Sequence, residues 1–198
     1  MTKTADTDHK IHNTLATRWS PYLFAETPVD VNDLQALFEA ARWAPSSYNE
    51  QPWRFIVGVA GQGDDHQRIL DCLAEPNRVW AGRAPVLVLG VVVDQFVPSG
   101  TPNKAAEHDL GLAVGNLLVE ATVRGLSVHQ MIGVDADAAK TEFGVPDSAH
   151  VLTAMAIGHA DKSGAGEAKY AERDNTTRTR KPLPEFVFGT RFGTSARF

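Results

Sequence analysis

The chain has 198 residues, of which 43% are hydrophobic and 22% are charged, a composition typical of one globular domain that buries a core. Its formal net charge of −5 argues against nucleic acid or an anionic membrane as a partner. The polar N-terminus resembles no signal peptide, and no run approaches the ~18 apolar residues of a membrane span, so we expect a cytoplasmic protein. The single cysteine, Cys72, excludes an intramolecular disulfide and is expected to be a buried thiol.

The first strong secondary-structure signal is a helix over residues 30–43. Its apolar face consists of Leu34, Leu37, Phe38 and Ala41. Asp30 is suited to cap the first turn, and Pro45 disfavours helical geometry at Ala44. The helix is therefore expected to end where a polar loop begins.

The next segments predict strands and one short helix. Residues 53–59 alternate as in a half-buried strand, residues 61–65 read as a turn, and a short helix is expected over 67–73. The nearly continuous apolar run over 85–93 fits a strand that is covered on both faces.

Residues 104–124 form the longest predicted helix. Its main apolar stripe consists of Leu110, Ala113, Val114, Leu117, Leu118 and Ala121. Gly125 follows as the C′ residue that ends the helix. Outside the stripe, small or apolar residues widen the surface: Gly111, Leu112, Gly115 and Val119. A helix that is apolar on more than one face is a core helix, and in an oligomer it can lie at an interface.

The C-terminal third adds two predicted strands, at 126–131 and 151–157, separated by a short helix over 135–143. Residues 185–188 are a candidate for one last strand. Residues 170–198 carry six basic and three acidic residues, so this segment is +3 and the rest of the chain is −8. A C-terminal tail without a core of its own is expected to pack against another surface, and the surface of a second subunit is one candidate.

Several common functional motifs are absent from the sequence. The glycine-rich stretch 58–63 lacks the G-x-G-x-x-G spacing and precedes Asp64 and Asp65, which would repel a phosphate, so an ordinary turn is favoured. The seven histidines show no H-E-x-x-H pattern, and no G-x-S-x-G elbow is present, so neither a metal site nor a hydrolase triad is expected. We interpret His108 and Asp109, on the long helix, as a surface pair.

Three polar stretches stand apart from the core pattern: RWSPY at 18–22, APSSYNEQPW at 44–53 and RTRKPL at 178–183. Arginine presents a rigid fork of donors that suits phosphate oxygens, and serine adds a hydroxyl. Two arginine clusters from opposite ends of the chain are therefore candidates to converge on one phosphate. The middle stretch offers serine, asparagine and backbone groups to the edge of a planar polar ring. Taken singly, none of the stretches indicates a binding site, because an arginine such as Arg18 is more often a surface residue and serines such as Ser46 and Ser47 are more often ordinary turn residues.

Together and in this order, the stretches resemble the nitroreductase family of flavin enzymes. The resemblance extends from Arg18 to about Gly193. It is carried most specifically by EAARWAPSSYNEQPWRFIV at 39–57, and also by DLGLAVGNLLVEATVRGLSV at 109–128 and TRKPLPEFVF at 179–188.

The resemblance implies a fold and an assembly. The fold is α+β, with a mixed central sheet flanked by helices, in an intertwined homodimer whose C-terminal tails are exchanged. We expect a flexible N-terminus over 1–13 and a single FMN-binding domain over 14–198. Within that domain, residues 160–198 form an arm that wraps the partner.

The resemblance also implies an FMN site shared between two subunits. The matching residues are Arg18, Trp19, Ser20, Tyr22, Pro45, Ser46, Ser47, Asn49, Gln130, Met131, Ile132, Gly133, Arg178 and Arg180. The first stretch and the C-terminal arginines match phosphate and ribityl contacts, with the arginine at 178 the weaker candidate. The loop over 45–49 would reach the flavin bound mainly by the other subunit. The segment 130–133 falls where the family's chain passes the flavin edge near N5 and O4.

The implied activity is a ping-pong cycle in which NADH or NADPH reduces FMN and a small-molecule electron acceptor reoxidises it. The family's acceptors include nitroaromatics, quinones and other conjugated electrophiles, and no protein residue is identified as catalytic because flavin N5 carries the hydride. One departure is Tyr22, where the family often has a lysine or arginine that stabilises the reduced ring. This departure keeps a second hypothesis open, an FMN-binding carrier or sensor without nicotinamide turnover.

Overall fold

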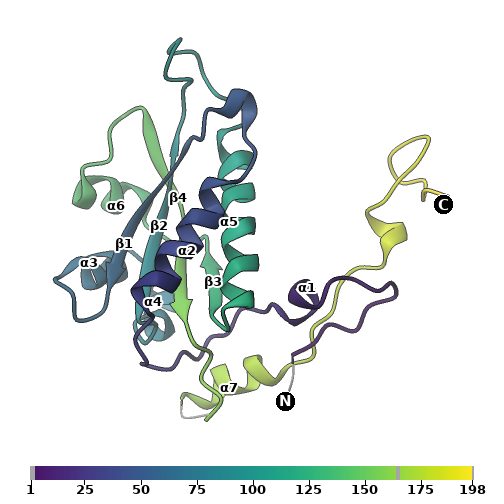
Figure 1. Cartoon of the computed structure of the whole chain (residues 1–198), viewed down its shortest axis with the longest axis horizontal. Coiled ribbons are helices and arrows are strands. Elements are labelled where there is room, and N and C mark those ends of the chain that lie inside the picture. The colour runs from purple at the N-terminus through teal and green to yellow at the C-terminus, as the bar shows by residue number, and fades with distance from the viewer. Residues whose placement is uncertain (1–2, 164–165, 198) are drawn as a thin grey trace.

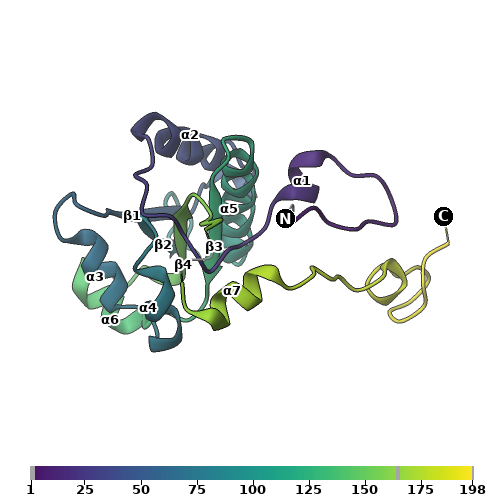
Figure 2. The same cartoon turned by 90° about the horizontal axis from the view of Figure 1, so that it is seen from below.

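The computed structural model describes residues 3–163 and 166–197. Its strands are β1 (Trp53–Val59), β2 (Val86–Val93), β3 (Ser127–Met131) and β4 (Ala149–Gly158). Its helices are α1 (Asn13–Thr17), α2 (Val31–Arg42), α3 (Asp65–Asp71), α4 (Glu75–Ala81), α5 (Ala106–Val123), α6 (Ala136–Phe143) and α7 (Ala168–Asn175). The sheet lies in the middle, with α2 and α5 on one face and α3, α4 and α6 on the other (Figure 1, Figure 2). The expected α+β class, with a central sheet flanked by helices, is confirmed.

The sheet has the strand order β1-β2-β4-β3, and every neighbouring pair in it is antiparallel. The expectation of a mixed sheet is therefore wrong for the strands that the described chain contains. The strand expected at 185–188 is also wrong. Leu183–Glu185 form a 3-10 turn, and Phe188 makes only an isolated bridge to Ser195. Pro182 and Pro184 supply no N–H group, which explains why this segment does not begin a strand ladder.

Strand β2 is buried along almost its whole length, as its continuous apolar run predicted. Leu87 and Leu89 pack into the core beneath α3, α4 and α6, whereas Val86 and Val88 pack into the core beneath α2 and α5. This alternation explains the run, because a strand with both faces covered has no position left for a polar residue.

The predicted helices form where local signals are strong. In α2 the Asp30 carboxylate accepts the N–H of Asn32 at 2.8 Å, and this confirms the predicted cap. Helix α5 ends at Val123, and Gly125 follows with a φ of +73° that is readily available only to glycine. The Leu126 N–H then donates to the Ala121 carbonyl at 2.8 Å, as in a Schellman C-cap. Among the helices of the described residues, none combines the length and the apolarity needed to cross a bilayer.

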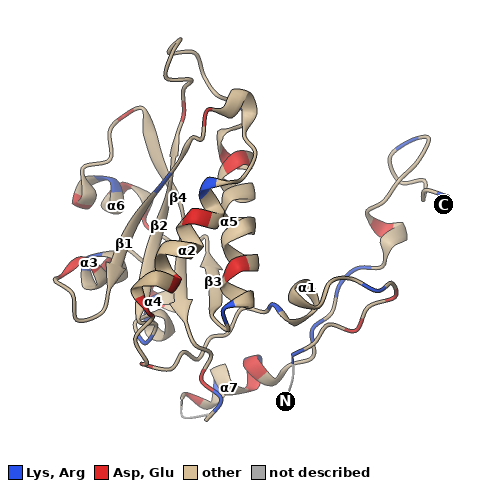
Figure 3. Ribbon diagram, viewed as in Figure 1, with Lys and Arg blue, Asp and Glu red and all other residues tan. Residues whose placement is uncertain are grey.

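The two ends of the chain leave the three-layered body together as an arm (Figure 1, Figure 2). The Ala5 N–H donates to the Ala16 carbonyl at 2.8 Å, and the Arg178 guanidinium donates to the same carbonyl, also at 2.8 Å. The expected flexibility over 1–13 stays a prediction, and its first two residues lie outside the described part. Lysine and arginine residues recur along much of the arm (Figure 3).

Candidate functional site

A pocket of about 270 Å³ lies where the arm joins the body. We call it the basic pocket, and its lining residues are Lys3, Arg18, Trp19, Ser20, Tyr22, Arg173, Asp174, Thr176, Thr177, Arg178 and Arg180. Five of these side chains are cationic and one is acidic. The first polar stretch of the sequence and the C-terminal arginines thus meet in one place, although about 160 residues separate them along the chain.

Three arginines of this pocket, Arg18, Arg178 and Arg180, repel one another. Burial, followed by the charges of Arg178 and Arg180, lowers the pKa of Arg18. Burial and the charge of Arg180 likewise lower the pKa of Arg178. Within the described residues, none of the three lies within ion-pair distance of a carboxylate. Arg18 Nη1 instead donates to Ser20 Oγ at 3.2 Å. Clustered cations without a counter-ion fit a doubly charged phosphate group.

The one carboxylate of the pocket, that of Asp174, is committed to the backbone. It accepts the Tyr22 N–H at 2.9 and 3.2 Å and the Leu23 N–H at 3.0 Å. These bonds join α7 to the segment that follows Ser20. Asp174 therefore positions the pocket and leaves the cationic side chains uncompensated.

Tyr22 lies inside an aromatic cluster beside the pocket. Its ring centroid is 5.1 Å from that of Trp80, 4.7 Å from that of His129 and 5.5 Å from that of Tyr170, with which it stacks. The Arg173 guanidinium lies 5.2 Å from the centroid of the Tyr22 ring, within cation–π distance. A cation is thus present next to the residue at which the sequence departs from the family.

The segment 130–133 begins at the end of β3, next to His129. His129 Nδ1 lies 2.8 Å from the Pro21 carbonyl, and burial lowers the pKa of this histidine. Gln130 and Ile132 are exposed, whereas the side chain of Met131 is buried in the core. Because its side chain is buried, Met131 can offer a ligand only its backbone atoms.

Gly133 completes this segment in a tight position. Its carbonyl accepts hydrogen bonds from Asn77 Nδ2 and from the Ala74 N–H, each at 3.0 Å. A Cβ at residue 133 would lie 2.5 Å from Asn77 Nδ2. The close approach explains the glycine, and it also commits the Asn77 amide to the backbone of this segment.

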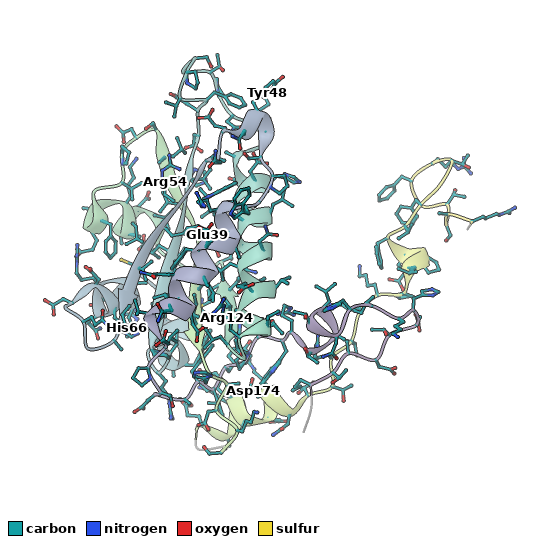
Figure 4. All side chains as sticks on the ribbon, viewed as in Figure 1. Glu39, Tyr48, Arg54, His66, Arg124 and Asp174 are labelled. Atoms are coloured by element: carbon teal, nitrogen blue, oxygen red, sulfur yellow. The ribbon has the colours of Figure 1, made fainter. Side chains whose placement is uncertain are left out.

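The opening loop with Pro45, Ser46, Ser47 and Asn49 lies at the other end of the molecule. Figure 4 shows Tyr48 and Asp174 at opposite ends of α5. Within one chain the structure therefore brings residues of the first polar stretch and of 178–180 together in the basic pocket. Residues 130–133 follow His129, which contacts Pro21 and Tyr22, whereas the loop over 45–49 lies apart from the pocket.

The opening loop has an unusual backbone. Tyr48, Asn49 and Gln51 all have positive φ angles, of 52°, 56° and 53°, and none of them is a glycine. The Gln51 N–H donates to Ser46 Oγ at 3.0 Å, and Gln51 Nε2 donates to the Asn49 carbonyl at 3.0 Å. Gln51 thus braces the loop. Strained, braced loops are frequent where a backbone must present groups to a ligand.

Asp109 also supports the opening loop, and its interpretation as a surface residue is wrong. Its side chain is almost fully buried, and Asp109 Oδ2 accepts the Ser47 N–H at 2.9 Å. The adjacent His108 is largely exposed, and its Nδ1 lies 3.2 Å from Asp109 Oδ1. The sequence carried no signal for this role, because the contact joins residues 62 positions apart.

Five further residues of the basic pocket were not identified from the sequence: Lys3, Arg173, Asp174, Thr176 and Thr177. No motif marks them, because each enters the pocket only through contacts of the folded arm. The sequence stretches thus pointed to residues that line this pocket, but not to the residues that support them.

Comparison with known proteins gives the family. The sequence model of the nitroreductase family matches residues 15–79 and 64–159. An uncharacterised 15.4 kDa protein of Mycolicibacterium smegmatis is 34% identical over 146 residues, which are 71% of this chain and 97% of that protein. A Streptomyces coelicolor protein, named as a candidate NADH dehydrogenase/NAD(P)H nitroreductase, is 29% identical over 157 residues, or 70% of this chain and 77% of that one.

A solved structure described as an oxidoreductase containing FMN superposes on this chain with a TM-score of 0.89. The two are 28% identical, and the match covers 96% of each chain. With the family match over residues 15–159, these similarities establish what kind of protein this is. The chain belongs to the nitroreductase family and is a nitroreductase-like oxidoreductase.

Proposed function

We propose that this protein is an FMN-dependent oxidoreductase that oxidises NADH or NADPH and reduces a small conjugated electrophile, such as a nitroaromatic or a quinone, in a ping-pong cycle. The observation that carries the proposal is the convergence of Arg18, Arg178 and Arg180 in one pocket without a carboxylate partner among the described residues. The similar solved structure contains FMN by its description, and the Streptomyces coelicolor relative is named for NAD(P)H. Both names support the proposed cofactors.

The residues of the basic pocket would hold the phosphate end of FMN. Arg18 and Arg180 would contact phosphate oxygens, Ser20 would add a hydroxyl, and Trp19 would contribute backbone or ring contact. The backbone over 130–133 would line the edge of the flavin ring. Bound there, FMN supplies a ring that accepts a hydride from the nicotinamide and passes electrons to the acceptor. The chain's own task is to bind, orient and tune that ring.

We further propose a homodimer in which each opening loop completes the partner's site. Within one chain the loop and the basic pocket lie at opposite ends of α5 (Figure 4), so one subunit alone does not form the whole site. The outward face of α5 exposes Leu112, Val119 and Val123, and a Cβ on Gly115 would meet no atom within 4 Å. An apolar, thin helix face of this kind suits close packing against a second subunit.

The position of Arg173 favours a reductase over the alternative of an FMN-binding carrier or sensor, which was suggested by Tyr22 in place of a cation. Its guanidinium lies over the Tyr22 ring and lines the same pocket, so it supplies the positive charge that tyrosine lacks. We expect Arg173→Ala to make the reduction potential of bound flavin more negative while FMN is retained. An unchanged potential would remove Arg173 from this role and strengthen the carrier hypothesis.

The direct test of the proposed site is a flavin titration of Arg18→Ala. Each hydrogen bond to a charged group contributes about 1.5–3 kcal/mol, so the dissociation constant of FMN should rise by roughly 10- to 150-fold. Arg68→Ala is the matched control, because Arg68 lies on α3 and pairs with Asp65 and Glu142 instead. Equal affinities of both variants would place the FMN phosphate elsewhere.

Subunit mixing tests the shared site separately. Arg18→Ala and Asn49→Ala change residues of different halves of each proposed site. In a mixed dimer, one of the two sites contains neither change, so equal mixing should restore about a quarter of the intact sites. Recovery of FMN-dependent activity above that of either variant supports the shared site. No recovery, with mixed dimers demonstrated by mass, would contradict it.

A further inference from the structure

The N-terminal segment over residues 3–6 is fastened to both sides of the basic pocket, and we call it the N-terminal strap. The Ala5 N–H donates to the Ala16 carbonyl at 2.8 Å. The Arg178 guanidinium donates through Nη1 to the Lys3 carbonyl at 2.5 Å and to the Ala16 carbonyl at 2.8 Å. One arginine of the C-terminal arm therefore holds both the strap and α1.

The strap delivers the Lys3 side chain to the pocket that Arg18 and Arg180 also line. Lys3 Nζ donates to the Thr176 carbonyl at 2.5 Å and lies 5.3 Å from the centroid of the Trp19 ring. Among the described residues, Lys3 has no carboxylate within ion-pair distance. Its ammonium group is therefore held in position, with its charge uncompensated, beside two arginines.

Arg178 has a different role from its two neighbours. Its Nη1 hydrogen bonds go to backbone carbonyls of the strap and of α1, not to a pocket side chain. A lysine on an unattached N-terminus would lose much conformational entropy on meeting a ligand, and the contacts to Arg178 and Ala16 remove part of that cost beforehand.

We propose that the N-terminal strap closes the basic pocket and supplies Lys3 as a further cation for the FMN phosphate, with Arg178 as the positioning residue that holds the strap. This inference rests on the proposed function and adds to it a binding residue from outside the three polar stretches. Cofactor binding and strap docking are then coupled, so each stabilises the other.

The test compares FMN affinity, by flavin fluorescence titration at low salt, for the full chain and three variants. Lys3→Ala should weaken FMN binding roughly three- to tenfold, because it removes one positioned charge near the phosphate. Lys10→Ala removes an exposed charge close in sequence to the strap but outside the pocket lining, so this variant should bind FMN as the unchanged protein does. Ala5→Pro keeps Lys3 but removes the N–H that fastens the strap, and it should weaken binding in the same direction.

Two further readouts separate the strap from a general effect of charge. Hydrogen exchange at the Ala5 amide should slow when FMN is added to the unchanged protein, because binding holds the strap in place. In an Arg178→Ala background, Lys3→Ala should have little additional effect, because the strap is already released. Full additivity of the two changes would contradict a positioning role for Arg178.

The outcomes distinguish this inference from the proposed function. If the unchanged protein binds FMN, and Lys3→Ala and Lys10→Ala have equal affinities, the strap inference is overturned while the FMN site stands. If the unchanged protein binds no FMN, the proposed function fails and the inference fails with it. Weaker binding by Lys3→Ala and Ala5→Pro, with Lys10→Ala unaffected, supports the strap.

Discussion

The substitution Asp174→Ala should detach the C-terminal arm from the body. The Asp174 carboxylate accepts the backbone N–H groups of Tyr22 and Leu23 at 2.9 and 3.0 Å. Hydrogen bonds to charged groups contribute about 1.5–3 kcal/mol each, and their loss leaves two N–H groups without this partner. Because Asp174 is half-buried, we take the lower value for each bond and expect the free energy of unfolding to fall by about 3 kcal/mol.

Chemical denaturation followed by tryptophan fluorescence measures this loss. Asp174→Asn keeps an acceptor oxygen without the charge, so it should lose about half as much. Glu172→Ala is the control, because Glu172 is exposed on the same helix and only its backbone carbonyl accepts a bond, from Thr176 Oγ1. If Asp174→Ala and Glu172→Ala unfold at the same denaturant concentration, the attachment of α7 does not depend on these bonds, and the reasoning is refuted.

Three further changes test other parts of the structure. Burial lowers the pKa of His129, so as the pH falls the unfolded chain takes up a proton on this histidine before the folded chain does. The free energy of unfolding should therefore decrease as the pH drops below about 6.5. If a His129→Gln variant loses stability with pH at the same rate in denaturation experiments, this reasoning is wrong. In Gly58→Ala the new Cβ would lie 2.5 Å from the backbone nitrogen of His66, so we expect the free energy of unfolding to fall by at least ~2 kcal/mol. Gly82→Ala should cost much less, because its closest contact, at 3.0 Å, is with the flexible Leu70 side chain. Val119→Glu should convert the proposed dimer to a monomer in light scattering, and equal masses would exclude α5 as the interface.

Local patterns predicted most elements of the body, although not α4, because each of these patterns is also the cause of its element. The alternation over 53–59, the double-sided apolar run of β2 and the stripe of α5 all follow from which faces are buried. Helix α7 was missed because it is polar almost all round, and only Tyr170 on it is buried. Its position depends on Asp174, a contact that spans about 150 residues and leaves no periodic signal.

The candidate site divides in the same way. Arg18 and Arg180 could be named as candidates because they belong to short polar stretches, and the structure brings these stretches together in one pocket. Lys3 and Asp109 were missed, because each acts through a contact with a distant segment. The expected mixed sheet failed for a related reason, since strand direction is decided by how the connections run and not by the composition of any one strand.

The central claim is that this chain binds FMN and turns it over with a reduced nicotinamide. The most direct measurement is to reconstitute the protein with FMN, remove free flavin, and add NADH or NADPH without oxygen while recording the flavin absorbance. We predict a retained flavin band that bleaches within seconds and recovers when a quinone or nitroaromatic is added. A band that is retained but never bleaches would contradict the reductase and favour the carrier, and a protein that retains no flavin would contradict the site itself.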